Sequence, residues 1–137
     1  IKMSSLTIVT YHYVRDLGSS KYPRIKGLDL KKFINQIEYF ENNYKFVSIE
    51  SVMDYIYYEE EPPPNAILLT FDDGYIDHYR HVFPLLQKKK IPGSFFPAAK
   101  PIMDHVVLDV NKIHFILASS NAEEIKNYVF NFLENID

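Results

Sequence analysis

The chain has 137 residues, of which 47% are hydrophobic and 24% are charged, a composition typical of one globular unit. Its net charge of -3 argues against a general nucleic-acid-binding protein, because contact with phosphates needs a concentrated basic surface. The chain has no cysteine, so a metal would have to be held by histidines and carboxylates. No apolar stretch approaches the roughly 18 residues typical of a transmembrane helix.

The first half of the chain predicts alternating strands and helices. Residues 6–11 (LTIVTY) are apolar and β-branched, as expected for a buried strand. Asp29 is the expected N-cap of a helix that extends to about residue 43 with apolar side chains on one face. A short strand is expected over 45–48, and Ser48 should cap a second helix, which the acidic and proline-rich stretch 59–64 ends.

The strongest strand signal is at residues 66–71 (AILLTF), which are almost wholly apolar and lie between helix-breaking residues. A third helix is expected over 77–90, with Pro84 bending or delaying its start. Its inward side chains should be Tyr79, Val82, Phe83 and Leu86. Residues 94–97 (SFFP) predict a fourth strand.

Helices follow the fourth strand. One is expected over 111–118, and Asn121 with Glu124 forms a candidate capping box for a last helix whose apolar residues fall on one stripe. The alternation of strands and helices favours an α/β fold of parallel strands with flanking helices. Because a closed parallel barrel takes about 250 residues, the sequence leaves two architectures open, a small open sheet or the first part of a barrel.

Two adjacent carboxylates, Asp72 and Asp73, follow the strongest strand and precede Gly74. Neighbouring strand residues point to opposite faces, so both can serve one site only if the strand ends there and the backbone turns, which glycine permits. One carboxylate could bind a metal ion while the other accepts a proton from a water molecule. The alternative is structural: a simple Asp-Gly turn, with Asp72 capping the next helix.

Three segments, residues 70–75 (TFDDGY), 10–14 (TYHYV) and 93–96 (GSFF), together resemble a known family. They are similar, in that order, to the first motif, an early Tyr-His segment and a later strand of the polysaccharide deacetylases, a family of carbohydrate esterases. The resemblance implies a distorted (β/α) barrel that removes acetyl groups from N-acetylated sugars of a polysaccharide or glycoconjugate with a divalent metal, most often zinc. By position, Asp72 matches the general base and Asp73 the metal-ligating aspartate.

The resemblance is partial. The family's second motif, which supplies two metal-binding histidines, has no match here, nor do the later motifs with an arginine, a tryptophan and an acid histidine. We therefore expect residues 1–100 to form the first part of the barrel and residues 101–137 to begin a helical insertion, with the missing motifs outside this chain. His12, which follows the first strand, and Tyr75, which is next to the two aspartates, are expected at the rim of the site.

Other interpretations remain open at this point. The chain could be a catalytically inactive fragment or a binding relic on the same fold. It could also be a phosphatase of the haloacid dehalogenase type, although those enzymes use Asp-x-Asp, so that both side chains point to one side of the strand. His78 and His81, three residues apart on a predicted helix, are expected to be surface or partly buried residues and not metal ligands.

Overall fold

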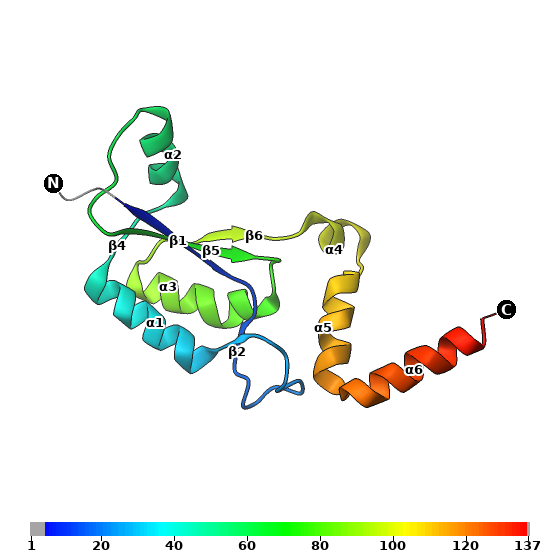
Figure 1. Cartoon of the computed structure of the whole chain (residues 1–137). Coiled ribbons are helices and arrows are strands. Elements are labelled where there is room, and N and C mark those ends of the chain that lie inside the picture. The colour runs from blue at the N-terminus through cyan, green and yellow to red at the C-terminus, as the bar shows by residue number, and fades with distance from the viewer. Residues whose placement is uncertain (1–4, 137) are drawn as a thin grey trace. The chain divides into compact units, whose positions relative to one another are not determined.

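A computed structural model describes residues 5–136 (Figure 1). These residues divide into two compact units, which we call the sheet unit (residues 5–15 and 27–98) and the helical unit (residues 16–26 and 99–136). The elements of the sheet unit are β1 (Leu6–Tyr11), β2 (Val14–Arg15), β3 (Leu28–Asp29), α1 (Leu30–Asn43), β4 (Lys45–Phe46), α2 (Ile49–Tyr57), β5 (Ala66–Asp72), the π-helix η1 (His78–Val82), α3 (Phe83–Lys89) and β6 (Ser94–Phe96). The helical unit contains α4 (Ala99–Asp104), α5 (Asp109–Ser119) and α6 (Ala122–Glu134).

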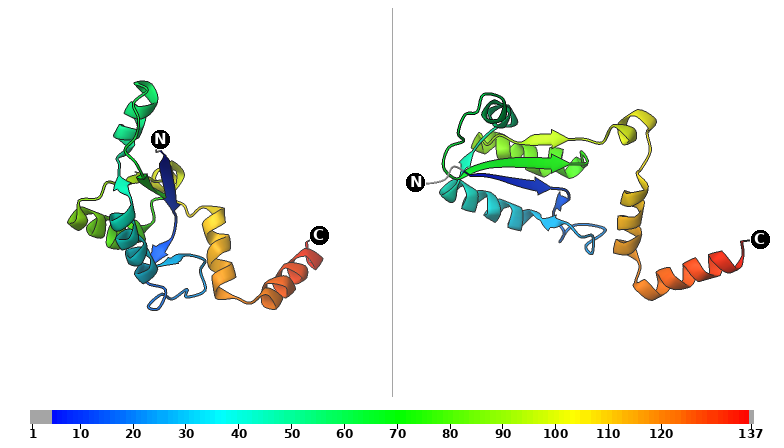
Figure 2. Two further views of the ribbon diagram at one scale, coloured as in Figure 1. Left: turned by 60° about the vertical axis from the view of Figure 1, so that its left-hand side comes forward. Right: turned by 45° about the horizontal axis from the view of Figure 1, so that its top comes forward.

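β5 is the central strand of the sheet unit. It pairs with β1 along one edge and with both β4 and β6 along the other, and every pair is parallel. The arrowheads of β1, β5 and β6 accordingly point the same way (right-hand view of Figure 2). The predicted α/β fold of parallel strands with flanking helices is therefore confirmed, and the carboxyl ends of three strands lie at one edge of the sheet.

The two faces of β5 contact different helices. Ile67, Leu69 and Phe71 pack in one cluster with α1 and α3, whose Phe33 and Leu86 belong to the same cluster. Ala66 and Leu68 pack on the opposite face, in a second cluster that includes Val52 of α2. Because successive strand residues alternate between faces, a strand covered on both sides must be apolar throughout, which explains the unbroken run at 66–71.

Capping residues begin the helices at the predicted positions. Asp29 accepts a hydrogen bond from the Lys31 backbone N–H at 3.0 Å at the start of α1. Ser48 accepts one from the Ser51 N–H at the start of α2. In the helical unit, Asn121 and Glu124 form the predicted capping box at the start of α6. Each cap satisfies N–H groups that have no partner within the helix.

The third predicted helix differs in detail from the expectation. It begins with the π-helix η1 and continues as α3 from Phe83, with Pro84 in the first turn of α3. Val82 and Leu86 are buried as predicted, but Tyr79 is 73% exposed and Phe83 is 45% exposed, so the prediction that these two face inward is wrong. The wider π turn rotates the side chains that follow it away from a regular 3.6-residue period.

The helical unit has few buried side chains. The rings of Tyr22 and Phe115 meet edge to face at 4.7 Å, and the Arg24 guanidinium donates to the Ala118 carbonyl at 3.1 Å. α6 has the predicted apolar stripe, yet none of its residues 122–134, all of them described, is buried. α4 was not predicted from the sequence. Among residues 5–136, the structure contains no helix with the length and apolar character needed to span a bilayer.

Candidate active site

The site lies where β1 and β5 end side by side. Tyr11 is paired with Phe71 at the last position of the ladder, so the next residues, His12 and Asp72, emerge next to each other. The His12 Nε2 atom is 3.9 Å from the Asp72 Oδ2 atom. Their side chains are 58% and 38% exposed, so both reach solvent at this edge of the sheet. The structure thus places His12 beside Asp72 at this edge of the sheet.

The chain turns sharply directly after Asp72. Asp73 and Gly74 both have positive φ angles, of 74° and 65°. Aspartate is one of the few residues other than glycine that adopt this region without large cost. The Asp73 N–H donates to the Phe96 carbonyl at 3.0 Å, which ties the turn to the end of β6. A Cβ atom on Gly74 would lie 2.6 Å from the Pro97 Cβ, so only glycine fits there.

The two aspartates do not cap the following helix. η1 begins after Asp77, which makes no side-chain capping bond, and the Asp72 carboxylate has its one polar contact within residues 5–136 with His12. The alternative in which Asp72 is a capping residue is therefore wrong. Both carboxylates are partly exposed at the strand end, in the position where parallel sheets bind ligands.

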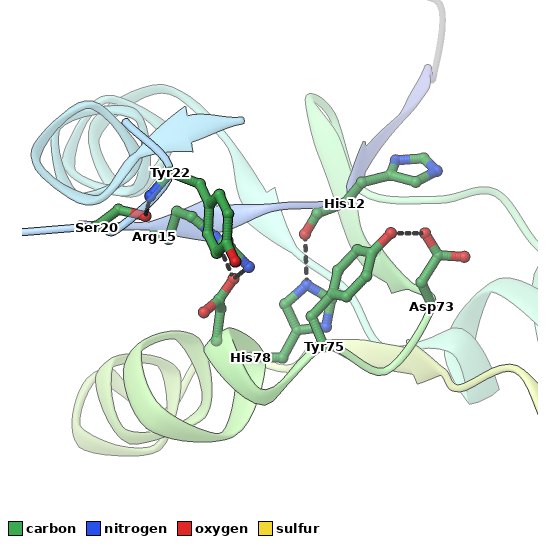
Figure 3. A network of polar contacts seen from close by, with 8 residues as sticks. His12, Arg15, Ser20, Tyr22, Asp73, Tyr75 and His78 are labelled. Carbon is green, nitrogen blue, oxygen red and sulfur yellow. Dashed lines mark hydrogen bonds and ion pairs between the residues drawn. The ribbon is translucent and has the colours of Figure 1, made fainter. Parts of the chain in front are cut away.

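Asp73 is held by the neighbouring tyrosine. The Tyr75 hydroxyl donates to the Asp73 Oδ2 atom at 2.6 Å (Figure 3). Burial, and after it the hydrogen bonds to Asp73 and Tyr13, raises the pKa of the Tyr75 hydroxyl far above its usual value. The phenol therefore keeps its proton at neutral pH and acts as a donor to the carboxylate. Tyr75, expected at the rim of the site, contacts one of its two acids.

Three contacts join the segment after β1 to the segment after β5. The Tyr13 ring stacks on the Tyr75 ring, with centroids 4.0 Å apart and an angle of 16° between the planes. The Arg15 guanidinium donates to the Asp77 Oδ2 atom from Nε at 2.8 Å and from Nη2 at 2.6 Å, and it lies 4.8 Å above the Tyr13 ring.

The third contact involves His78, whose Nε2 is 2.6 Å from the His12 carbonyl oxygen (Figure 3). Since a carbonyl oxygen only accepts, Nε2 is the donor in this contact. Nδ1 is buried without a hydrogen-bond partner in the described part of the chain. The ring is enclosed by Phe71, Tyr75 and Phe95, with centroids 5.6 to 6.0 Å away.

His78 is 3% exposed, so the expectation of a surface or partly buried residue is wrong. Its burial could have been recognised from spacing, because His78, Val82 and Leu86 recur every four residues. Arg15, Tyr13 and Asp77 were also missed. No local signal identifies the pair of Arg15 and Asp77, because the two residues are 62 positions apart in the sequence.

The described residues do not by themselves form a metal site. Among residues 5–136, no group of three or more histidine, cysteine, aspartate or glutamate side chains is placed to hold a metal ion. Asp73 fits a single ligand position, because Tyr75 donates to its Oδ2 atom and no other described side chain hydrogen-bonds to its Oδ1 atom. A carboxylate oxygen is a ligand that Zn²⁺ and other divalent ions accept.

The chain is similar in sequence to known polysaccharide deacetylases. The family model described as polysaccharide deacetylase matches residues 59–129, just over half of the chain and including Asp72 and Asp73. YxkH of Bacillus subtilis, a protein named for this family, is 26% identical over 102 residues, which cover 74% of this chain and 34% of YxkH. The poly-beta-1,6-N-acetyl-D-glucosamine N-deacetylase of Escherichia coli K12 is 40% identical over 90 residues, which cover 65% of this chain and 13% of that protein.

A solved structure shares the fold. The structure of a de-N-acetylase from Aggregatibacter actinomycetemcomitans superposes with a TM-score of 0.58 and 26% sequence identity, over 67% of this chain and 37% of that one. The similarity agrees with the predicted relation to deacetylase barrels. The chain spans about a third of YxkH and a smaller share of the Escherichia coli protein.

Proposed function

Since the chain belongs to the polysaccharide deacetylase family, we propose that it forms the first part of a catalytic domain that hydrolyses the acetamide bond of N-acetylated sugars in a glycan. The observation that carries this proposal is the pair of acids at the end of β5: Asp72 is beside His12, and Asp73 is held by Tyr75. We keep the division into residues 1–100, the start of the barrel, and residues 101–137, a helical insertion, as part of the proposal.

We assign Asp72 the role of general base. Its carboxylate is partly exposed, has no capping role and is beside an imidazole, so it can accept a proton from a water molecule that attacks the acetamide carbon. The water oxygen forms a bond to that carbon, the carbon–nitrogen bond breaks with transfer of a proton to the departing nitrogen, and the products are acetate and a free amine. His12, 3.9 Å away, gives the Asp72 carboxylate a polar partner at the rim of the site.

We assign Asp73 the role of a metal ligand, with zinc as the proposed ion. When bound, such an ion would polarise the acetamide carbonyl and favour ionisation of water. Asp73 is suited to this role because its Oδ2 atom is fixed by the Tyr75 hydroxyl. The remaining ligands, which the family's second motif would supply, have no counterpart among the described residues.

Two substitutions test the assignments in the full-length protein. Asp72→Asn should retain the metal and lose about 10²- to 10⁴-fold in the rate of acetate release from N-acetylglucosamine oligomers, as expected when a general base is removed. Asp73→Ala should lose the metal, measured as the metal content per chain after dialysis. Asp54→Asn, on the exposed side of α2, is the matched control and should change neither quantity.

The outcomes separate the alternatives. A metal retained in Asp73→Ala would overturn the assignment of Asp73. Release of phosphate from phosphomonoesters in Mg²⁺, without release of acetate, would indicate a phosphatase. A full-length protein that binds the glycan but releases neither acetate nor phosphate would be the inactive binding relic.

A further inference from the structure

We propose that Tyr75 is a positioning residue, which fixes the direction of the Asp73 carboxylate, and that Tyr13 and Arg15 in turn fix Tyr75. This inference rests on the proposed function, in which Asp73 is a metal ligand. It concerns residues of the sheet unit only, and the series of contacts that carries it lies within and between the segment after β1 and the segment after β5.

Asp73 needs an external group to orient it. It lies in a turn at positive φ, not within a strand or helix, and only its backbone N–H is tied to a neighbouring strand. A short side chain in such a turn can rotate about its Cα–Cβ bond between staggered positions. The Tyr75 hydroxyl selects one of them, because it binds Oδ2 and leaves Oδ1 directed elsewhere. Metal-ligating carboxylates commonly need such a hydrogen bond to hold their direction.

Tyr75 can provide a fixed donor because its ring is packed on two sides. The Tyr13 ring lies 4.0 Å away and nearly parallel, and the His78 ring meets it at 5.8 Å and 66°. A tyrosine has two rotatable side-chain bonds, and both are constrained when the ring faces are covered in this way. The position of the hydroxyl is therefore set by packing and not by the hydrogen bond alone.

Tyr13 is fixed in its turn. It is 5% exposed. A Cβ atom on Gly27 would lie 2.8 Å from the Tyr13 Cβ, so the Gly27 backbone packs closely against Tyr13 and restricts its movement. The Arg15 guanidinium covers the ring at 4.8 Å and is itself held by Asp77. These contacts form a continuous series from Asp77 through Arg15, Tyr13 and Tyr75 to Asp73.

The test is Tyr75→Phe in the full-length protein, which keeps the stacked ring and removes only the hydroxyl. Affinity for Zn²⁺, measured by competition with a chromophoric chelator, should fall about 10- to 100-fold, the usual effect of losing a partner of a metal ligand. Thermal stability is measured in parallel, because a purely structural role would lower the melting temperature and leave the affinity unchanged. Tyr57→Phe, a 70% exposed tyrosine of α2, is the matched control and should bind Zn²⁺ as the wild type does.

A second variant, Tyr13→Leu, removes the stacked ring but leaves the Tyr75 hydroxyl in place. It should weaken Zn²⁺ binding in the same direction and to a smaller extent. If Tyr75→Phe does not fold, Tyr13→Leu is the test of the inference. A Zn²⁺ affinity of Tyr13→Leu equal to that of the wild type then overturns it. A wild-type protein that binds Zn²⁺ and releases acetate, with Tyr75→Phe equal to it in affinity, overturns the inference and leaves the proposed function intact. A wild-type protein that binds no divalent metal overturns both.

Discussion

Helices α1 and α6 both have apolar side chains at helical spacing, but they differ in what those side chains contact. In α1 of the sheet unit, Phe33 and Ile37 are completely buried against β1 and β5. In α6 of the helical unit, Tyr128 is 76% exposed and Phe132 is 61% exposed. An amphipathic pattern therefore predicts a helix and which of its faces is apolar. How much that face stabilises the fold depends on a partner surface that covers it.

The two units also differ in how many of their side chains are buried. β5 is covered on both faces, and its neighbours determine where the candidate catalytic residues lie. The described residues of the helical unit include the cap of α6 and one edge-to-face ring pair. We therefore expect substitutions in the two units to differ strongly in their effect on the free energy of unfolding.

The largest expected difference is between two phenylalanine deletions. Phe71→Ala should lower the free energy of unfolding by about 3–5 kcal/mol, because it removes a fully buried ring from the centre of the core. Phe132→Ala should change it by less than about 0.5 kcal/mol, because the ring is largely exposed. Denaturant titration measures both. Equal costs for the two substitutions would contradict the comparison and show that the α6 stripe is buried in solution.

Two glycine substitutions should show a smaller difference in stability between the two units. Gly74→Ala should cost about 1–3 kcal/mol, because the new Cβ would lie 2.6 Å from the Pro97 Cβ at a residue with a φ of 65°. Gly18→Ala in the helical unit should be close to neutral, since its Cβ would meet Asp16 Oδ1 at an ordinary 3.5 Å. Melting temperatures of the two variants measure the difference. A neutral Gly74→Ala would indicate that the turn after Asp73 can relax.

The smallest expected effect is a pH dependence in the sheet unit. Burial raises the pKa of Tyr11 to about 12. Above pH 10 the unfolded chain loses this proton while the folded chain keeps it, so stability present below pH 10 is lost as the pH rises toward 12. Between pH 9 and 12 the wild type should therefore lose about 1–2 kcal/mol more than Tyr11→Phe. Parallel loss in the two proteins would mean that water reaches the Tyr11 hydroxyl.

Local sequence was sufficient to determine several parts of this protein. The apolar run at 66–71 requires a strand buried on both faces, and Asp29, Ser48 and Asn121 begin helices because their side chains accept N–H bonds within three residues. The two acids followed by glycine identified the strand end where the candidate site lies and carried the family resemblance. Each of these features depends on residues close together in the chain.

The tertiary structure decided the rest, because the remaining features depend on contacts between residues far apart in the chain. The exposure of Tyr79 and Phe83 follows from a π turn that periodicity does not reveal. The bonds from His78 to the His12 carbonyl and from Arg15 to Asp77 join residues more than 60 positions apart. Such pairs require the parallel pairing of β1 and β5, which brings the ends of the two strands together.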